Sequence, residues 1–523
     1  MSNNPTSKPS WQQLEKLARD IKQQNITDLF DEDPSRFENL SVLKDSLLFD
    51  YSKHHINQDV MNALLNLLDE TGFKEKRDAM FSGEKINHTE NRSVLHTALR
   101  RPINDEVLVD SEDIIPEIHE TLSRIKQVSE KLHAQQIKGA TDKNIDTIVS
   151  IGVGGSDLSI RMAIQALKTK YTSHLKTHFV SNIDGEEIQN VLAQCNPETT
   201  LFVVVSKSFK TQETLTNAQT ARAWLQDNLP SGSNISPHFI AVSSNIDAAT
   251  KFGVKENSIY PMWDWVNGRF SLWSAVGLPI ALHYGFDVFR EILDGAYKAD
   301  QDFLNDDLDQ NIPVIMALLG IWNRNFMDYG CHAILPYTEK LKYMPAHIQQ
   351  LKMESNGKNI DNDGQKVNYK TCPVIFGDVG TNGQHSFFQL LHQGSDKVPC
   401  DFIGVRHDEN GLKNHHKILL NNMLAQGQTM LQGKRYPNNP YNTFEGNIPC
   451  STMIFDQIDA ISLGYLIALY EHKTFTQGVL WNINSFDQYG IELGKELARK
   501  LENNDISDAD PSTKALYSYI HKD

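Results

Sequence analysis

The first hundred residues carry apolar positions with a helical period. In 11–21, 57–68 and 94–100, apolar side chains recur three and four residues apart, which is the spacing of one face of a helix. This part of the chain contains no convincing series of strand patterns. The sequence therefore predicts a helical N-terminal segment over residues 1–110.

From about residue 144 the pattern changes to short, nearly continuous apolar runs that alternate with helical stretches. The first four runs lie within 146–153, 175–183, 199–208 and 238–244. A second series lies within 332–337, 372–380, 400–405 and 478–486. A long helical stretch, roughly 271–326, separates the two series. Runs of this kind are typical of parallel strands buried on both faces of a sheet.

Two such series predict two domains of the α/β class. Each would be a doubly wound parallel sheet, the first over 111–285 and the second over 286–523, with helical additions at the N-terminal and C-terminal ends. A chain of 523 residues is also longer than one hydrophobic core usually serves. In open parallel sheets, ligands bind beyond the carboxyl ends of the strands, so we expect the functional residues there.

Composition narrows the class of protein. The chain is 40% hydrophobic and 22% charged, which is ordinary for a globular enzyme. Its net charge of −16 argues against nonspecific binding of nucleic acid or of an anionic membrane by the whole surface. An anionic ligand would therefore need local positive charge.

No part of the sequence predicts export or membrane insertion. Residues 1–17 lack the apolar core of a secretory signal, and no uninterrupted apolar stretch approaches the length of a membrane span. The five cysteines are scattered and are never spaced as CxxC, which indicates a reduced compartment and no structural zinc. The sequence predicts a cytoplasmic protein without a metal.

A glycine-rich turn, IGVGGSDL, ends the apolar run at 145–153 and opens a helical pattern. Glycines allow a ligand to approach the backbone, and a helix N-terminus attracts anions. Ser156 and Asp157 could equally be helix N-caps. Asp157 stands where the dinucleotide fingerprint needs its third glycine, and the Gly-Lys-Ser/Thr of a P-loop is absent. The turn thus suits a small phosphate better than a dinucleotide or a nucleoside triphosphate.

A second hydroxyl cluster, SKSFKTQET, follows the apolar run at 201–205. Its hydroxyl side chains and lysines could bind a phosphate monoester through several convergent donors. A helix N-cap followed by a solvated helix start is the alternative for this stretch alone. Two such clusters, each ending a strand of the same predicted sheet, favour a phosphate site.

Two further positions carry charge in unusual surroundings. Arg269 lies within the apolar and aromatic stretch 264–278, and arginine is rarely buried without a partner. It could form a salt bridge to Asp264 or another carboxylate, or it could face a developing oxyanion as a fixed positive charge. Glu354 precedes the turn signal Asn356-Gly357, where a solvated glutamate is the ordinary alternative.

His385 lies where a glycine-rich loop becomes a helix, and a catalytic role is open to it. His392 follows seven residues later, which is not the spacing of a HExxH metal pair. Lys495 lies in a predicted amphipathic helix over 485–501, whose polar face is the default place for a lysine. Together with the phosphate clusters, Arg269 and Glu354, these residues suit proton transfer on a phosphorylated sugar.

Seven stretches resemble blocks of the glucose-6-phosphate isomerase family, in the family's order between Thr89 and Lys495. They are TENRSVLHTALR, IGVGGSDL, SKSFKTQET, DWVNGRFSLWSAVGL, MESNGK, GTNGQHSFFQLLHQG and YEHKTFTQGVLWNINSFDQYGIELGK. The resemblance implies two flavodoxin-like sugar-isomerase (SIS) domains. It implies interconversion of D-glucose 6-phosphate and D-fructose 6-phosphate in glycolysis and gluconeogenesis, without a cofactor. It also implies a homodimer whose active site takes its histidine from the neighbouring subunit.

The resemblance also implies roles for single residues. Glu354 matches the base that moves a proton between C1 and C2, and Arg269 matches the arginine that stabilises the enediolate. His385 and Lys495 match the pair that opens the sugar ring. The matching substrate positions are Gly155, Ser156, Ser206, Lys207, Ser208, Thr211 and Gln350.

The sequence departs from the family's blocks at a few positions. Ser159 and Ile160 replace a usual Gly-Pro, and Ser208 and Lys210 replace threonines. Ser208 keeps a hydroxyl, and Lys210 adds positive charge near an anion. Asn267 replaces a usual glycine before Arg269, and it would alter the backbone there if that position needs a positive φ.

Three other functions fit parts of the sequence. A sugar-phosphate-binding regulator would not need Glu354, His385 and Lys495 together, and no basic helix-turn-helix pattern is visible. An isomerase of aminated sugars would typically carry a glutamine-hydrolysing N-terminus with a nucleophilic cysteine, whereas this chain begins Met-Ser. A binding role outside the cell stays open for any member of this family.

Overall fold

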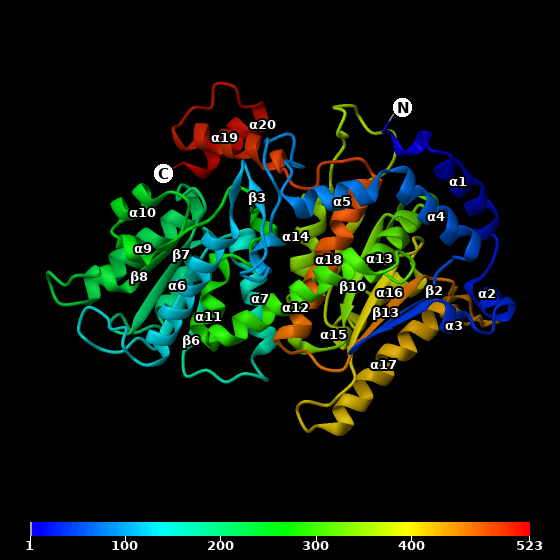
Figure 1. Ribbon diagram of the computed structural model, residues 1–523, viewed down its shortest axis with the longest axis horizontal. Coiled ribbons are helices and arrows are strands. Elements are labelled where there is room, and N and C mark those ends of the chain that lie inside the picture. The colour runs from blue at the N-terminus through cyan, green and yellow to red at the C-terminus, as the bar shows by residue number, and fades with distance from the viewer. Residues whose placement is uncertain (1–2, 523) are drawn as a thin grey trace. The chain divides into compact units, whose positions relative to one another are not determined.

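The computed structural model describes residues 3–522 as two compact units (Figure 1). Unit 1 spans Met1–Ser485 and contains both large sheets. Unit 2 spans Phe486–Asp523 and contains helices only, within the residues described.

The first sheet of unit 1 has five parallel strands in the order β6-β5-β7-β8-β9. The strands are β5 (Thr147–Ile151), β6 (Lys176–Val180), β7 (Thr200–Val205), β8 (Phe239–Val242) and β9 (Ile259–Tyr260). The four runs predicted between 146 and 244 are therefore strands, as expected. β5 and β7 are neighbours in register, with Ile151 opposite Val204, so their carboxyl ends lie side by side.

Alternate side chains of this sheet face a core formed with the helices that follow the strands. Val149, Ile151, Phe202 and Val204 pack there with apolar residues of three helices. These are α8 (Gly185–Leu192), α9 (Gln212–Asn228) and α10 (Ile246–Phe252). The helix α11 (Leu278–Tyr284) packs against β5 and β6, and it also contacts α6 (Ile115–His133) and α7 (Leu158–Leu167). Burial on both faces explains why β5 and β7 are buried at every position and mostly apolar.

The second sheet has six strands in the order β1-β2-β13-β12-β10-β11. Four of them are parallel, namely β10 (Cys331–Pro336), β11 (Val374–Gly377), β12 (Cys400–Val405) and β13 (Cys450–Phe455). β2 (Leu47–Lys53) pairs antiparallel with β13, and β1 (Ser41–Lys44) pairs antiparallel with β2. The prediction of an α/β fold with two mainly parallel sheets is confirmed.

Three predictions about single elements were wrong. The N-terminal hundred residues are not all helical, because they supply β1 and β2 to the edge of the second sheet. The run 478–486 is not a strand; it lies at the end of the long helix α18 (Ala460–Leu480) and in the turns that follow. The stretch 94–100 is irregular and ends in a short 3-10 turn, η2 (Ala98–Arg100).

The remaining helices of unit 1 cover the second sheet and join the two sheets. At the N-terminus they are α1 (Pro9–Ile21), α2 (Ile26–Glu32), α3 (Arg36–Asn39), α4 (Gln58–Glu70) and α5 (Phe73–Ser82). Between the sheets and beyond lie α12 (Phe286–Asn305), α13 (Ile312–Ile321), α14 (Met344–Asn356), α15 (Gly380–Gln384), α16 (Phe388–Gln393) and α17 (Lys413–Gln432). α18 is buried along nearly its whole length and packs against α12, α13 and α14.

Unit 2 contains the 3-10 turn η11 (Tyr489–Ile491) and two helices, α19 (Glu492–Glu502) and α20 (Pro511–Ile520). The helix predicted from residue 485 therefore begins at Glu492. The hydroxyl of Tyr517 in α20 donates to the Oδ1 of Asn504, just past the end of α19, at 2.7 Å. Among the described residues of the whole chain, no helix is both long and apolar enough to cross a membrane.

Candidate active site

Arg269 lies in a 3-10 turn, η6 (Gly268–Phe270), and its side chain is fully buried. Its Nε donates to the hydroxyl of Ser355 at 2.7 Å, and its Nη2 donates to the backbone oxygen of Ser485 at 2.6 Å. Its Nη1 lies 3.6 Å from the Oε1 of Glu354. The predicted alternative, a salt bridge from Arg269 to a carboxylate, is therefore present with Glu354 as the partner, while Asp264 pairs with Lys207 at 3.3 Å.

Glu354 lies in the last turn of α14 with 24% of its side chain exposed. Gln350 precedes it by four residues, so the two side chains share one face of the helix. The Nε2 of Gln350 donates to the Oε2 of Glu354 at 2.9 Å. The Oε1 of Gln350 is buried and has no hydrogen-bond partner among the residues that the structure describes. The face of α14 that carries Glu354 thus also presents an acceptor for a ligand hydroxyl.

The glycine-rich turn after β5 forms η3 (Gly154–Ser156) and packs directly on the Arg269 turn. A Cβ at Gly155 would lie 2.1 Å from the backbone oxygen of Gly268, so only glycine fits at this contact. A Cβ at Gly154, whose φ is +61°, would lie 3.1 Å from the Nε2 of Gln350. Gly155, Arg269, Gln350 and Glu354 are therefore brought together by three separate segments of the chain.

Asp157 occupies the N-cap position of α7, but its side chain makes no capping hydrogen bond. It pairs instead with Arg161, whose Nη2 lies 3.0 Å from its Oδ1. Burial raises the pKa of Asp157 above its ordinary value, and Arg161 opposes that shift. The capping interpretation of the Asp157 side chain is wrong, and the residue anchors α7 through this pair.

The second hydroxyl cluster follows β7 at the same edge of the sheet. Phe209 has a φ of +48° and packs into the core, which leaves Ser208 exposed beside it. Ser206 is buried, and its Oγ lies 3.4 Å from the Oγ1 of Thr211. Thr211 is the N-cap of α9, and its side chain makes no capping bond to the helix. Hydroxyl groups therefore surround the start of α9.

Lys207 does not extend into solvent as its position in the cluster suggests. Its Nζ donates to the backbone oxygen of Val266 at 3.2 Å and lies 3.3 Å from an oxygen of the Asp264 carboxylate. Burial lowers the pKa of Lys207, and Asp264 opposes that shift. Lys207 thus ties the loop after β7 to the segment that carries Arg269. Asn267 in that segment has a φ of −84°, so the concern that it needs a positive φ does not apply.

His385 lies between α15 and α16 and is exposed. It lines an open surface pocket of about 650 Å³ together with side chains of α16, α17 and the segment after α17. The other residues lining this pocket are Gln384, Phe388, Gln389, His392, Gln426, Gln428, Thr429, Gln432, Gly433, Lys434, Tyr436 and Phe444. Neither Glu354 nor Arg269 is among them, so this pocket and the Glu354 site are different parts of unit 1.

Lys495 lies in α19 of unit 2, half exposed, and its Nζ is 3.1 Å from the Oε1 of Glu492. Ser355 and Ser485 hold the Arg269 guanidinium and were not among the residues predicted from the sequence. Both lie within the family-like blocks, but their residue types gave no signal. Their function depends on which segments the fold brings together.

The fold and this site define a class of protein. A carboxylate faces a buried guanidinium, next to glycine and hydroxyl loops at the carboxyl ends of parallel strands. That is the arrangement of an α/β enzyme that performs acid–base chemistry on an anionic substrate.

Comparison with known proteins is more specific. The sequence model of one family, phosphoglucose isomerase, matches residues 50–517. Glucose-6-phosphate isomerase of Methylococcus capsulatus is 46% identical, with 98% of each chain covered. Glucose-6-phosphate isomerase 1 of Chromohalobacter salexigens is 47% identical, with 99% of this chain and 95% of that protein covered. A crystal structure of a glucose-6-phosphate isomerase from Chlamydia trachomatis has a TM-score of 0.89 at 33% identity and covers 99% of both chains. The chain belongs to the phosphoglucose isomerase family.

Proposed function

We propose that this protein interconverts D-glucose 6-phosphate and D-fructose 6-phosphate, in glycolysis and gluconeogenesis. One observation carries the proposal. The Oε1 of Glu354 lies 3.6 Å from the Nη1 of a buried arginine, so a base and a fixed positive charge meet at one point. The names of the relatives support glucose 6-phosphate as one substrate that this geometry would serve.

The substrate's phosphate binds at the adjacent carboxyl ends of β5 and β7. The hydroxyls of Ser156, Ser206, Ser208 and Thr211 and the N-terminus of α9 supply donors for it. Gly155 lets the backbone of the first loop approach closely. Lys207 adds local positive charge and holds the second loop against the Arg269 segment. This charge is needed because the whole chain carries −16.

The proton transfer then takes place beside Glu354. Its carboxylate removes the proton from C2 of the open sugar and returns a proton to C1. The intermediate is a cis-enediolate, and the guanidinium of Arg269 opposes its negative charge. The free Oε1 of Gln350 accepts a hydrogen bond from a sugar hydroxyl. The reaction moves hydrogen within one molecule, so it balances without a cofactor.

Ring opening precedes this step and is the task of His385 and Lys495. We assign His385 to the site of a neighbouring subunit, because in its own chain it lines a pocket without Glu354. The working form is accordingly a homodimer. A cytoplasmic location, and domains over 1–110, 111–285 and 286–523, complete the proposal.

Replacing the base tests the proposal directly. Glu354→Gln should keep the hydrogen bonds of the side chain but lower isomerisation by about 10²–10⁴-fold, since a neutral amide cannot accept the C2 proton. A coupled assay that starts from fructose 6-phosphate and detects glucose 6-phosphate, in chelator, measures turnover. Calorimetric titration with the same sugar phosphate should show binding within a few-fold of wild type.

The matched control is Glu339→Gln, because Glu339 is a glutamate on the surface. Among the ion pairs of the described residues, its one partner is Lys342, at 3.1 Å. This control should keep full activity. Near-normal turnover by Glu354→Gln would rule out Glu354 as the base.

A further inference from the structure

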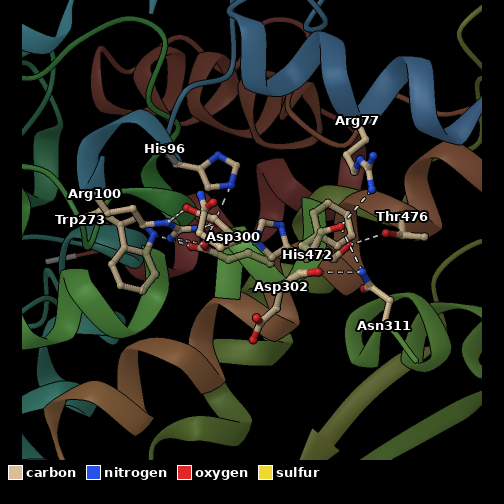
Figure 2. Close-up of polar contacts among 12 residues, drawn as sticks. Arg77, His96, Arg100, Trp273, Asp300, Asp302, Asn311, His472 and Thr476 are labelled. Carbon is tan, nitrogen blue, oxygen red and sulfur yellow. Dashed lines mark hydrogen bonds and ion pairs between the residues drawn. The ribbon is translucent and has the colours of Figure 1, made fainter. Parts of the chain in front are cut away.

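A network of buried polar side chains includes Arg100, Trp273, Asp300 and His472 (Figure 2). Its centre is Arg100 at the end of η2, which is fully buried. The guanidinium binds Asp300 of α12 through two parallel hydrogen bonds, of 2.6 Å from Nε and 2.5 Å from Nη2. Its Nη1 donates to the Oε2 of Glu471 in α18 at 3.0 Å. The Nε2 of His472 lies 2.8 Å from the Oδ1 of Asp300.

Trp273 joins this network from the Arg269 segment. Its indole Nε1 donates to the Oε1 of Glu471 at 2.8 Å. The guanidinium carbon of Arg100 lies 4.6 Å from the centre of the indole rings. Figure 2 labels both side chains. Trp273 is completely buried, so the indole is held both at its edge and over its face.

The backbone between Arg269 and Trp273 transmits this constraint. The N–H of Ser271 donates to the backbone oxygen of Gly268 at 3.1 Å, and the N–H of Ser274 donates to that of Ser271 at 3.0 Å. Two consecutive turns therefore connect the arginine to the tryptophan four residues later. A displacement of the indole would therefore act on the backbone that carries Arg269.

A second contact acts from the other side of Arg269. The ring of Phe270 lies 4.7 Å from that of His96, centre to centre, and the Nε2 of His96 lies 3.9 Å from the Oε2 of Glu471. The network thus contacts Phe270, which follows Arg269 directly, and Trp273, which lies four residues after Arg269.

Stability alone is a weak explanation for this network. Burying one guanidinium and two carboxylates costs several kcal/mol per ion, and apolar residues of similar volume often stabilise a fold as well or better. What such a network supplies in addition is a fixed direction for each member. An enzyme needs such a fixed direction in the group whose charge opposes a developing oxyanion.

We infer that Trp273 is a positioning residue for the reaction, whose hydrogen bond to Glu471 fixes the turn that directs the Arg269 guanidinium at Glu354. The inference rests on the proposed role of Arg269. It assigns Trp273 no contact with the substrate.

A double-mutant cycle tests the inference. Trp273→Phe keeps an aromatic ring and removes the indole N–H. It should lower kcat about tenfold, because a misdirected guanidinium loses part of the roughly 10²–10³-fold effect of an oxyanion donor. The KM should stay within about twofold, since the phosphate loops are untouched. In an Arg269→Lys background the same change should lower kcat by less than about twofold, because the guanidinium that it positions is gone.

Trp322→Phe is the matched control. Trp322 is also fully buried, and its Nε1 donates to the backbone oxygen of His55 at 2.8 Å. Its kcat should equal that of wild type. If Trp273→Phe yields no folded protein, Glu471→Gln takes its place in the same cycle, since it removes the charge from the acceptor of the indole bond.

Three results would overturn the inference. An unchanged kcat in Trp273→Phe shows that the indole bond positions nothing. An equal loss of kcat in the wild-type and Arg269→Lys backgrounds shows that Trp273 acts on stability and not through the arginine. Full activity of Arg269→Lys alone would show that the proposed role of Arg269 is wrong, and the inference about Trp273 would then fail with it. This result differs from the first two, in which only the inference about Trp273 fails.

Discussion

Arg269, which faces Glu354, and Lys352, on the same helix as Glu354, are buried cations that differ in how firmly they hold their charge. Arg269 keeps its charge at any physiological pH, since a guanidinium does not lose its proton in proteins. Lys352 precedes Glu354 by two residues on α14, is almost completely buried and donates to the Oε1 of Gln477 in α18. Burial lowers the pKa of Lys352 to about 7, and the charge of Lys473 adds to the shift. An arginine is therefore the suitable cation for a site that must stay positive.

The lowered pKa of Lys352 predicts a pH-dependent contribution to stability. Between pH 7 and about 10 the unfolded chain binds a proton that the folded chain lacks, so the stability of the fold rises with pH. The effect is at most about 1.4 kcal/mol per pH unit. Lys352→Met removes this gain. Its melting temperature relative to wild type should therefore fall steadily as the pH rises from 7 to 9.5.

Lys126→Met is the control for removing one charge, because Lys126 is half exposed on α6. Its melting temperature should differ from wild type by the same amount at every pH. A constant difference for Lys352→Met as well would show that the buried amine is charged in the folded protein throughout this range.

At the scale of elements, the site depends on how closely the turn after β5 approaches the Arg269 turn. Gly155→Ala tests this contact, because its Cβ would lie 2.1 Å from the backbone oxygen of Gly268. One turn must then move, at a cost of about 1–3 kcal/mol for overpacking. We expect a lower melting temperature and a loss of kcat/KM of about tenfold or more, since phosphate loop and arginine no longer keep their spacing.

The control for this prediction is Gly185→Ala at the first residue of α8. No atom lies within 4 Å of a Cβ built there, among the described residues. Alanine also favours the helix. This variant should match wild type in both measurements, and equal activity of Gly155→Ala would mean that the contact does not set the geometry of the site.

The sequence predicted those elements whose local pattern agrees with their surroundings in the fold. β5 and β7 are buried at every position and mostly apolar because both faces of their sheet are covered. α18 is equally apolar because helices surround it, and its end was mistaken for a strand since periodicity cannot separate the two. β2 was missed because its partner β13 lies some four hundred residues away, and such pairing leaves little local signal.

The candidate site shows the same limit at the level of side chains. Arg269 could be found because a charged residue is unusual in an apolar stretch. Glu354 could be found because it lies in a block that resembles a known family. Ser355, Ser485 and Trp273 could not, since each acts through a partner that only the fold supplies. Residues that react with a substrate can be predicted from their residue type. The residues that hold them in position cannot, because their role depends on tertiary contacts.

At the scale of the whole molecule, the separation of His385 from Glu354 predicts a site shared between subunits. Glu354→Gln and His385→Ala should each be nearly inactive alone. A hybrid dimer of the two, isolated with two affinity tags, contains one site with both changes and one site with neither. It should regain about half the activity of a wild-type dimer, because two-fold symmetry gives two sites of which one is intact. The coupled assay on the purified hybrid measures this.

The matched hybrid pairs Glu354→Gln with Arg269→Lys. These two residues lie 3.6 Å apart in one chain, so each site of this hybrid carries one of the two changes and no activity should return. Recovery in the first hybrid and not in the second requires that the histidine alone crosses between subunits. If the first hybrid stays as inactive as its parents, each chain builds its site with its own His385, and unit 1 must then rearrange to bring that side chain out of its surface pocket to Glu354.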